Sequence, residues 1–317
     1  MEYIYINRTN FNNYLSEIES LYKDCFGKLN TDDYFKWRYL DNPYDDIQII
    51  VAINASKLVS FYAVSPRELL FKNQTFKTAI SLNTMTHPDY RGRGLFVTLA
   101  DKLYKNLYNQ GYEMVWGYPN NISHRTFISK LQWNNIYEIP TLENNIGDIN
   151  IDKISCKKKF KIVNDNSFNN DYDKLSLDAS KFIVNKDSSV LKRRYYNNPN
   201  NEYINYCIID NNAVSSFIVA KKYNDQINII DYIYKSKDEF FSLFNKIINL
   251  CYDTDIKKVT LWNSIDSDLR NDLEKLGFYN NYPIRYFGGR LLNTKISKDD
   301  FLNWNNWMLS MGDNNEY

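Results

Sequence analysis

The start of the chain places apolar side chains at the spacing of amphipathic helices. Between residues 11 and 25 the apolar positions recur every three or four residues, so they share one side of a predicted helix. Residues 32–39 predict a second, shorter helix, and Thr31 is the residue expected to cap its first turn. The chain is therefore expected to begin with two helices, each with one face available for packing.

Alternating apolar and polar residues then predict a series of strands. Residues 47–53 and 58–64 have the pattern of an antiparallel hairpin, and residues 68–76 predict another hairpin. Two further strands are expected at 79–86 and 112–118, on either side of an amphipathic helix. This order of helices and strands supports a mixed α/β class, and the pattern alone goes no further.

A glycine-rich turn, Arg91-Gly92-Arg93-Gly94, separates the strand at 79–86 from that helix. Glycine lets the backbone approach a ligand closely, because no Cβ stands in the way. The first N–H groups of the helix have no partner within it, and the helix dipole adds partial positive charge there. The helix is marked by a stripe of leucines four residues apart: Leu95, Leu99, Leu103 and Leu107. Together with the two arginines, this arrangement predicts a phosphate or pyrophosphate site.

The turn matches neither of the two commonest phosphate-binding motifs. It lacks the Gly-Lys-Ser/Thr ending of the Walker motif, and Val97 stands where the dinucleotide fingerprint has its third glycine. A bare Arg-Gly-x-Gly can also mark nothing more than a tight turn. The surrounding sequence has to decide between a ligand site and a simple turn.

That surrounding sequence resembles the GNAT superfamily of acyl-CoA-dependent N-acyltransferases. Its members carry Gln/Arg-x-x-Gly-x-Gly/Ala after a strand, often preceded by His-Pro-x-Tyr. This chain reads His87-Pro88-Asp89-Tyr90-Arg91-Gly92-Arg93-Gly94-Leu95-Phe96, with a match at Arg91 and Gly94 and a departure at Phe96, which replaces a small residue. Downstream, Asn121 leads at the family spacing to Ser129-Lys130-Leu131-Gln132-Trp133. The resemblance covers about the first 140 residues, within the usual boundary tolerance.

The resemblance implies a fold and a co-substrate. The fold is a mixed, mostly antiparallel sheet flanked by helices, in which the strands at 79–86 and 112–118 splay apart around the pantetheine arm of acyl-CoA. Met85 and Thr86 would hold that arm, and Asn121 would lie near its reactive end. The pyrophosphate would bind backbone amides from the following residues: Arg91, Gly92, Arg93, Gly94, Leu95 and Phe96. No metal is implied.

The catalytic acid of the family has no direct counterpart here. The tyrosine that often protonates the departing thiolate falls at Ile128, which cannot donate a proton. Tyr118 and His124 are the candidates for acid or base, since both residue types can move a proton. Tyr118 also has a plainer reading as a core tyrosine, and His124 could equally face the solvent.

A second copy of the sequence pattern follows the first. Residues 35–43 return as residues 191–199, and the hairpin that follows stays in register. Trp37, Arg38 and Tyr39 are candidates for the wall of an acceptor pocket. Arg38 and Tyr39, however, return as Arg194 and Tyr195, which favours a shared structural role for them.

The second copy has lost the glycine turn. Between residues 229 and 248, where the turn should fall, no glycine is present. We therefore expect two α/β modules: residues 1–145, which bind acyl-CoA, and residues 146–317, a degenerate module with a docked C-terminal tail. The second module either supplies a wall for the acceptor or is purely structural.

Composition sets the remaining limits. With 39 Lys+Arg against 38 Asp+Glu, nothing favours nucleic acid or an anionic membrane as a partner. The four cysteines form no Cys-x-x-Cys, so reduced, buried thiols are favoured over disulfides or zinc. The first residues lack a signal-peptide pattern, and no run approaches the ~18–20 apolar residues of a membrane helix. The expected location is the cytoplasm.

These observations favour an N-acyltransferase that uses acyl-CoA, most simply acetyl-CoA, to acylate a primary amine. A tryptophan followed by Gly312-Asp313 near the C-terminus resembles GNAT-like proteins of bacterial surface-polysaccharide biosynthesis, which implies an amino-sugar acceptor. Aminoacyl transfer into peptidoglycan precursors is one alternative, although transfer RNA would require a more basic surface. A non-catalytic acyl-CoA-binding or scaffold protein is the other. The oligomeric state is left open.

Overall fold

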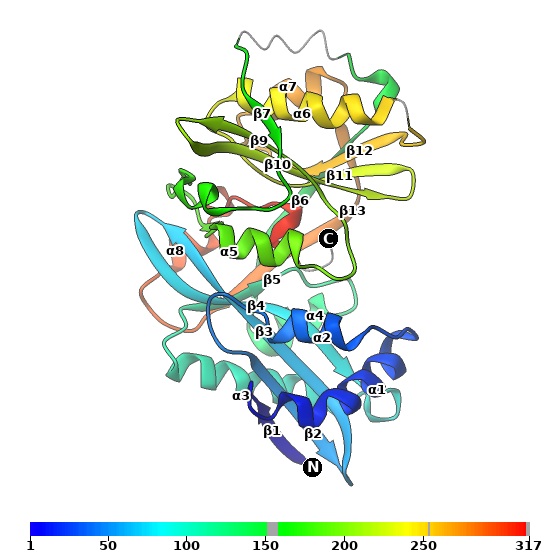
Figure 1. Cartoon of the computed structure of the whole chain (residues 1–317). Coiled ribbons are helices and arrows are strands. Elements are labelled where there is room, and N and C mark those ends of the chain that lie inside the picture. The colour runs from blue at the N-terminus through cyan, green and yellow to red at the C-terminus, as the bar shows by residue number, and fades with distance from the viewer. Residues whose placement is uncertain (151–157, 253, 315–317) are drawn as a thin grey trace. The chain divides into compact units, whose positions relative to one another are not determined.

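The structure is a computed structural model that describes residues 1–150, 158–252 and 254–314 (Figure 1). The chain folds as two compact units. The first unit combines residues 1–137 with residues 286–306, and the second combines residues 138–285 with those from 307 onward. Residues 138–145, which the sequence assigns to the first module, lie in the second unit.

The first unit is built on a sheet with the strand order β1-β2-β3-β4-β5-β13. Its strands are β1 (Glu2–Ile6), β2 (Gln48–Asn54), β3 (Lys57–Phe71), β4 (Gln74–Thr86), β5 (Met114–Gly117) and the C-terminal end of β13 (Tyr279–Leu291). Neighbouring strands are antiparallel except β4 and β5, which run parallel. A parallel pair needs a crossover connection, and here the crossover contains a helix.

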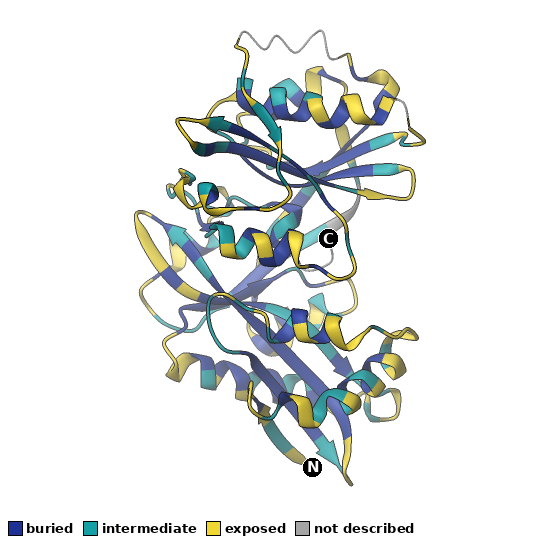
Figure 2. Cartoon of the chain, in the orientation of Figure 1, coloured by how far each residue is buried: buried dark blue, intermediate teal, exposed yellow. Residues whose placement is uncertain are grey.

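Helices cover both faces of this sheet (Figure 1). They are α1 (Leu15–Phe26), α2 (Asp32–Tyr39), α3 (Leu95–Asn109), α4 (His124–Leu131) and the short α8 (Lys298–Leu302). Side chains of α1 and α2 pack with Ile49 and Phe61, whereas those of α3 and α4 pack with Ile50 and Tyr62. Because neighbouring strand residues point to opposite faces, the sheet has an apolar core on each side. Figure 2 shows the buried residues following its central strands.

In the second unit the strand order is β6-β12-β11-β10-β9-β7. Its elements are β6 (Asn134–Asn145), β7 (Ile162–Asn164), β8 (Ile183–Val184), α5 (Ser188–Leu191), β9 (Ile204–Asp210), β10 (Ala213–Tyr223), β11 (Gln226–Ile233), α6 (Lys237–Tyr252), β12 (Lys258–Trp262) and α7 (Arg270–Lys275). Only β11 and β12 are parallel among the neighbouring pairs of the described sheet. One face of α6 is buried against this sheet.

The order of elements in the second unit repeats that of the first. The series α2-β2-β3-β4-α3-β5-α4 is followed later by α5-β9-β10-β11-α6-β12-α7. Within the second unit residues 141–145 of β6 pair with β12, and within the first unit residues 288–291 of β13 pair with β5. The mixed, mostly antiparallel α/β class with two modules is therefore confirmed.

Several local predictions for the first unit also hold, although the strands expected separately at 58–64, 68–76 and 79–86 join into the two long strands β3 and β4. The second helix spans Asp32–Tyr39, and the Thr31 hydroxyl accepts a hydrogen bond from Tyr34 N–H at 3.2 Å. The hairpin at 68–76 turns at Lys72-Asn73, whose φ angles are 49° and 60°. Strand β1 was not anticipated. No described helix is both long and apolar enough to cross a membrane.

Candidate functional site

Strands β4 and β5 separate partway along their length. Their parallel pairing runs from Thr78–Met114 through Ala79–Val115 and ends at Ile80–Trp116. Beyond that last pair, here called the apex, β4 continues to Thr86, whereas β5 stops at Gly117. Pairing therefore ends at the apex, as the expected splay requires, and this leaves backbone groups of β4 beyond the apex without a β5 partner.

A β-bulge in β4 lies just beyond the apex. Tyr62 pairs with Thr84 and Val64 with Ser81, so β4 contains one more residue than β3 over this interval. The extra residue brings the Asn83 side chain to α2, where its Oδ1 accepts hydrogen bonds from Arg38 Nε at 2.6 Å and Tyr39 Oη at 3.0 Å. Bulges re-aim side chains next to functional sites, and this one is fixed by two donors from one helix.

The positions of Arg38 and Tyr39 favour their structural reading. Tyr39 is buried, and burial raises the pKa of its hydroxyl above the usual value, so it acts as a neutral donor to Asn83. Its counterpart Tyr195 donates in the same way to Asp231 of β11, at 2.8 Å. Trp37 is also buried, with its ring 6.0 Å from that of Tyr34. A role for these three residues in an acceptor pocket stays a prediction.

The glycine turn presents unsatisfied donors to open space. Gly92 and Gly94 have φ angles of 75° and 74°, in the left-handed region that favours glycine. A Cβ added to either residue would meet no atom within 4 Å. Within the described chain, the N–H groups from Arg93 to Phe96 donate to no protein acceptor. The start of α3 can therefore offer several N–H groups to a pyrophosphate.

The two arginines of the turn are exposed and held by local contacts. Arg91 Nε donates to the carbonyl of Thr86 at 3.2 Å, and Arg93 Nη2 donates to the carbonyl of Asp89 at 2.9 Å. The Arg93 guanidinium also lies 4.8 Å from the centre of the Tyr90 ring. Both charges consequently stay beside the turn, where they add to the partial charge of the helix end.

Phe96 belongs to the core beneath the turn. Its ring centre lies 5.5 Å from that of Tyr62 and 5.2 Å from that of Phe127, both in edge-on geometry. Edge-to-face aromatic contacts at this distance are favourable. The large residue thus replaces the small one of the family motif by packing between β3 and α4, which leaves the open side of the turn clear.

Tyr118 and His124 approach the sheet from opposite faces. The His124 ring stacks on Tyr286 with centres 3.9 Å apart, and its Nε2 lies 3.2 Å from Asn135 Oδ1. The Tyr118 ring contacts that of Phe287, with centres 5.4 Å apart. Because Tyr286 and Phe287 are consecutive strand residues, their side chains point to opposite faces. The two candidates for proton transfer are therefore not neighbours on one surface.

Asn121 lies in the exposed loop between β5 and α4. The preceding residue shapes this loop, since Asn120 Oδ1 accepts hydrogen bonds from the N–H groups of Ile122 and Ser123 at 3.1 and 2.9 Å. Ile128 on α4 packs against the α3 side of the core. The position of the family's acid is thus filled by an aliphatic side chain.

A chain of polar side chains on the same side of the sheet, three of them buried, was not anticipated. It contains Ser81, Tyr62, Tyr104 and Trp133, linked by hydrogen bonds of 2.9–3.1 Å. The sequence shows each of these residues only as part of an alternating or periodic pattern. Their meeting requires contacts between β3, β4, α3 and the segment after α4, which no local signal encodes.

The second unit has a carboxylate where the first has an open turn. Glu239, in the first turn of α6, accepts hydrogen bonds from the Ser216 hydroxyl and from Lys235 N–H, the latter at 3.1 Å. Glu239 is buried. Its own charge therefore occupies donors near the helix start, and it would repel a phosphate there.

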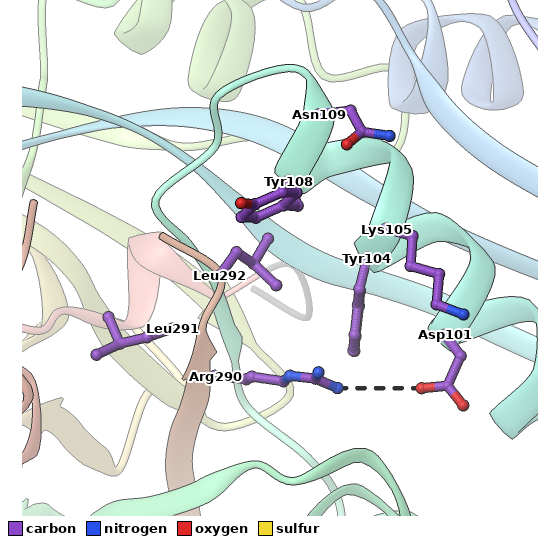
Figure 3. Close-up of a pocket in the computed structure, with 8 residues that line it drawn as sticks. All are labelled: Asp101, Tyr104, Lys105, Tyr108, Asn109, Arg290, Leu291 and Leu292. Carbon is purple, nitrogen blue, oxygen red and sulfur yellow. Dashed lines mark ion pairs between the residues drawn. The ribbon is translucent and has the colours of Figure 1, made fainter. Parts of the chain in front are cut away.

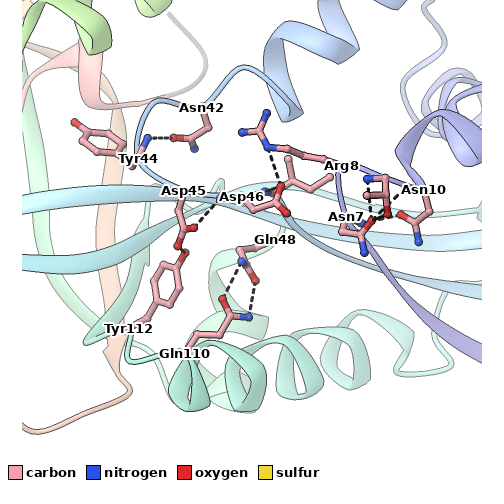
Figure 4. Close-up of polar contacts among 12 residues, drawn as sticks. Asn7, Arg8, Asn10, Asn42, Tyr44, Asp45, Asp46, Gln48, Gln110 and Tyr112 are labelled. Atoms are coloured by element: carbon pink, nitrogen blue, oxygen red, sulfur yellow. Dashed lines mark hydrogen bonds and ion pairs between the residues drawn. The ribbon is translucent and has the colours of Figure 1, made fainter.

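Two hollows lie on the first unit away from the apex. The larger, about 410 Å³, is formed by α3 and β13 and includes Asp101, Tyr104 and Arg290 (Figure 3). The smaller, about 230 Å³, lies among β1, β2 and α3. Figure 4 shows contacts near the smaller one, where Gln48 and Gln110 bond each other and Tyr112 Oη donates to Asp45 at 2.9 Å. Those polar groups already have partners.

The described residues show neither a metal cluster nor a disulfide. They contain no group of three or more His, Cys, Asp or Glu residues placed to hold a metal ion. Cys25, Cys207 and Cys251 are free thiols, and the last two are buried. Cys156 lies outside the described residues.

Comparisons with known proteins find GNAT-related sequences and folds. Residues 8–135 match the model of the acetyltransferase (GNAT) domain. Over 244 residues the chain is 25% identical to a protein of the Melanoplus sanguinipes entomopoxvirus whose name provisionally assigns it glycylpeptide N-tetradecanoyltransferase activity, covering 75% of this chain and 73% of the viral one.

Solved structures share the fold over most of the chain. A GCN5-related N-acetyltransferase from Anabaena variabilis superposes with a TM-score of 0.70 at 16% identity, covering 92% of this chain and 73% of that one. A tandem GNAT protein from the clavulanic acid biosynthesis pathway superposes with a TM-score of 0.57 at 9% identity, covering 93% of this chain and 100% of that one. The chain therefore has the two-module GNAT fold, and its residues 8–135 are similar to the GNAT acetyltransferase domain.

Proposed function

We propose that this protein is an acyl-CoA-dependent N-acyltransferase in which the first unit binds acyl-CoA and transfers the acyl group to a primary amine. The observation that carries the proposal is the open glycine turn at the start of α3, next to two strands that splay at the apex. The N–H groups from Arg93 to Phe96 would hold the pyrophosphate, with Arg91 and Arg93 beside them. Met85 and Thr86 of β4 would hold the pantetheine arm.

We propose that the transferred acyl group is short, namely acetyl. The side of the apex opposite Ser81 is filled by large rings, since Trp116 is 1% and Phe287 0% exposed. The Trp116 indole is also fixed, because its Nε1 donates to Thr78 Oγ1 at 3.0 Å. A closely packed interior resists the insertion of additional methylene groups. The name of the viral relative favours a 14-carbon chain instead, so both lengths enter the test below.

For the acceptor we propose a primary amine whose nitrogen reaches the apex in its neutral form. An amino sugar of a bacterial surface glycan is the candidate suggested by the sequence of the C-terminal tail. The N-terminal glycine of a peptide is the candidate suggested by the name of the viral relative. No nucleic-acid or membrane partner is proposed, and the cytoplasm remains the expected location.

Acetyl-CoA is expected to stabilise the protein against heat. At a concentration of about 100 Kd, a ligand that binds only the folded state adds about 2.7 kcal/mol to the free energy of unfolding, a shift of several degrees. A Gly94→Glu variant should lose this response, because a carboxylate would stand in the phosphate site. The measurement is a thermal melt with and without acetyl-CoA, repeated with tetradecanoyl-CoA.

Gly111→Glu is the matched control. Gly111 has a φ of 77°, its Cβ would also meet open space, and it lies past the other end of α3. The two variants therefore share the backbone strain and the added charge and differ in distance from the turn. If wild type and Gly111→Glu respond and Gly94→Glu does not, the turn is the binding site. If wild type responds to neither acyl-CoA, the proposed function is wrong.

Turnover with a panel of amines then separates enzyme from scaffold. The panel contains an amino sugar, a glycine-terminated peptide and a simple alkylamine, and release of the free thiol of CoA is followed with each. A protein that binds acetyl-CoA but turns over with none of them would favour the scaffold alternative. With an active amine in hand, Tyr118→Phe and His124→Ala test the two acid and base assignments, and each should slow turnover about 10²–10⁴-fold if its residue transfers a proton.

A further inference from the structure

A chain of hydrogen bonds crosses the α3 side of the first unit and ends at the apex. Trp133 Nε1 donates to Tyr104 Oη at 3.0 Å. Tyr104 Oη lies 2.9 Å from Tyr62 Oη, which lies 3.1 Å from Ser81 Oγ. Tyr62, Tyr104 and Trp133 are 0%, 2% and 3% exposed. Three buried polar groups in one line are costly unless each is satisfied, and here each one is.

The chemistry of the four groups permits a chain of hydrogen bonds directed toward Ser81. An indole N–H can only donate, so Tyr104 Oη must accept from Trp133. The Tyr104 hydroxyl can then donate to Tyr62 Oη, and the Tyr62 hydroxyl can donate to Ser81 Oγ. With its oxygen accepting from Tyr62, Ser81 has its own proton available for a group outside the chain. In this arrangement each hydrogen bond strengthens the next toward Ser81.

Ser81 stands where the reactive end of the co-substrate is expected. It is the first residue of β4 after the last pair with β5, Ile80–Trp116. A Cβ added to Gly117, the last residue of β5, would lie 3.4 Å from the Cβ of Ser81. Ser81 also shares its face of the sheet with Ile128, since both lie with the α3-side core around Tyr62. A hydroxyl therefore approaches the apex from the side on which the family's acid is missing.

Building on the proposed function, we propose that Ser81 is the catalytic proton donor to the sulfur that leaves acyl-CoA, and that Tyr62 and Tyr104 are positioning residues that supply it. The amine lone pair forms the new C–N bond, and the electron pair of the C–S bond goes to sulfur. Ser81 gives its proton to sulfur and takes the proton of Tyr62, which takes that of Tyr104. The attacking amine becomes positively charged and loses a proton to water. A water molecule then gives a proton to Tyr104.

One member of the chain, Tyr104, lies next to a hollow of the first unit. Tyr104 lines the hollow formed by α3 and β13, and Figure 3 shows its ring beside Arg290 and Asp101. The Arg290 guanidinium lies 5.7 Å from the centre of the Tyr104 ring and 3.9 Å from the Asp101 carboxylate. Burial raises the pKa of Tyr62 to about 12 and that of Tyr104 well above its usual value. Both phenols therefore stay protonated near neutral pH and can pass a proton on.

The thiol of bound CoA reports on this contact without any knowledge of the acceptor. In the complex with CoA, a donor to sulfur stabilises the thiolate, so Ser81→Ala should raise the pKa of the bound thiol by about one unit, a tenfold loss of thiolate at a given pH. Tyr62→Phe keeps the ring but removes the donor behind Ser81, and a smaller rise is expected. The measurement is the ultraviolet absorption of the thiolate against pH, with desulfo-CoA as the blank.

Tyr112→Phe is the matched control for Tyr62→Phe. Tyr112 is equally buried in the same α3-side core, but its hydroxyl donates to Asp45. Its loss should leave the thiol pKa unchanged. If the Ser81→Ala protein binds CoA as tightly as wild type and its thiol pKa does not move, the assignment of Ser81 is overturned while the proposed function stands. If wild type itself does not bind CoA, the proposed function fails first.

Discussion

Replacing Lys186 with methionine is expected to lower the free energy of unfolding of the second unit by about 3–5 kcal/mol, because it leaves two buried carboxylates without their cation. The Lys186 ammonium bonds Asp231, and it lies 3.5 Å from Asp313 Oδ1 and 3.3 Å from Ser310 Oγ. The side chains of Lys186, Asp231 and Asp313 are 5%, 3% and 4% exposed. Burial acts to lower the pKa of Lys186, but the charges of Asp231 and Asp313 outweigh it and raise that pKa.

The loss should be read by urea unfolding of the full chain, with Lys181→Met as the control. Lys181 pairs with Asp266 at 2.6 Å, but both side chains are partly exposed, so about 0.2–1 kcal/mol is expected. Adding Asp313→Asn to Lys186→Met should recover part of the loss, since one of the two repelling charges is removed. Equal losses for the two lysine variants would show that the buried cluster adds nothing beyond an ordinary surface pair.

This cluster explains why Ser310 and Asp313 are buried in the second unit. A Cβ added to Gly312 would lie 2.2 Å from Tyr195 Oη and 3.0 Å from the Asp231 carboxylate, so the backbone passes closer than any other residue would allow. Asp231 accepts from Tyr195 as Asn83 accepts from Tyr39 in the first unit. The second unit has thus kept the tyrosine contact of the repeat. Next to this contact, Asp313 near the C-terminus supplies a carboxylate that pairs with Lys186.

Most of the correct predictions from the sequence concern features that depend on residues close together in the chain. Thr31 caps α2 and the glycine turn starts α3, because capping hydroxyls and glycines act on their immediate neighbours in the chain. The leucine stripe of α3 is buried for the same reason, since its period is a property of one helix. Such features need no knowledge of the rest of the fold.

The features that the sequence did not reveal join segments far apart in the chain. The bulge that brings Asn83 to α2 depends on the register between β3 and β4. The bonds between Ser81, Tyr62, Tyr104 and Trp133 depend on packing between two strands and a helix. The strand that completes the first sheet comes from residues 288–291, after the second repeat. A repeat signal finds two copies of a module, but it cannot say which copy a final strand joins.

Gly289→Val is expected to lower the free energy of unfolding of the first unit by about 3 kcal/mol, near the upper end of the range for overpacked positions. Gly289 of β13 pairs with Trp116 of β5, and its added Cβ would lie 2.6 Å from the carbonyl oxygen of Val115. That oxygen belongs to the backbone of a sheet and cannot move aside alone. Because β5 forms one side of the splay, the variant should also lose much of its thermal response to acetyl-CoA.

Gly147→Val is the control, since a Cβ on Gly147 meets open space and the residue is exposed. It should melt within a degree or so of wild type, as surface substitutions usually cost no more than about 0.5 kcal/mol. A lower melting temperature for Gly289→Val together with a weakened response to acetyl-CoA would tie the acyl-CoA site to a strand from the end of the chain. Melting and response like those of wild type would instead show that β13 can separate from β5 without loss of stability. The arrangement of β4 and β5 would then depend only on strands β1 to β5.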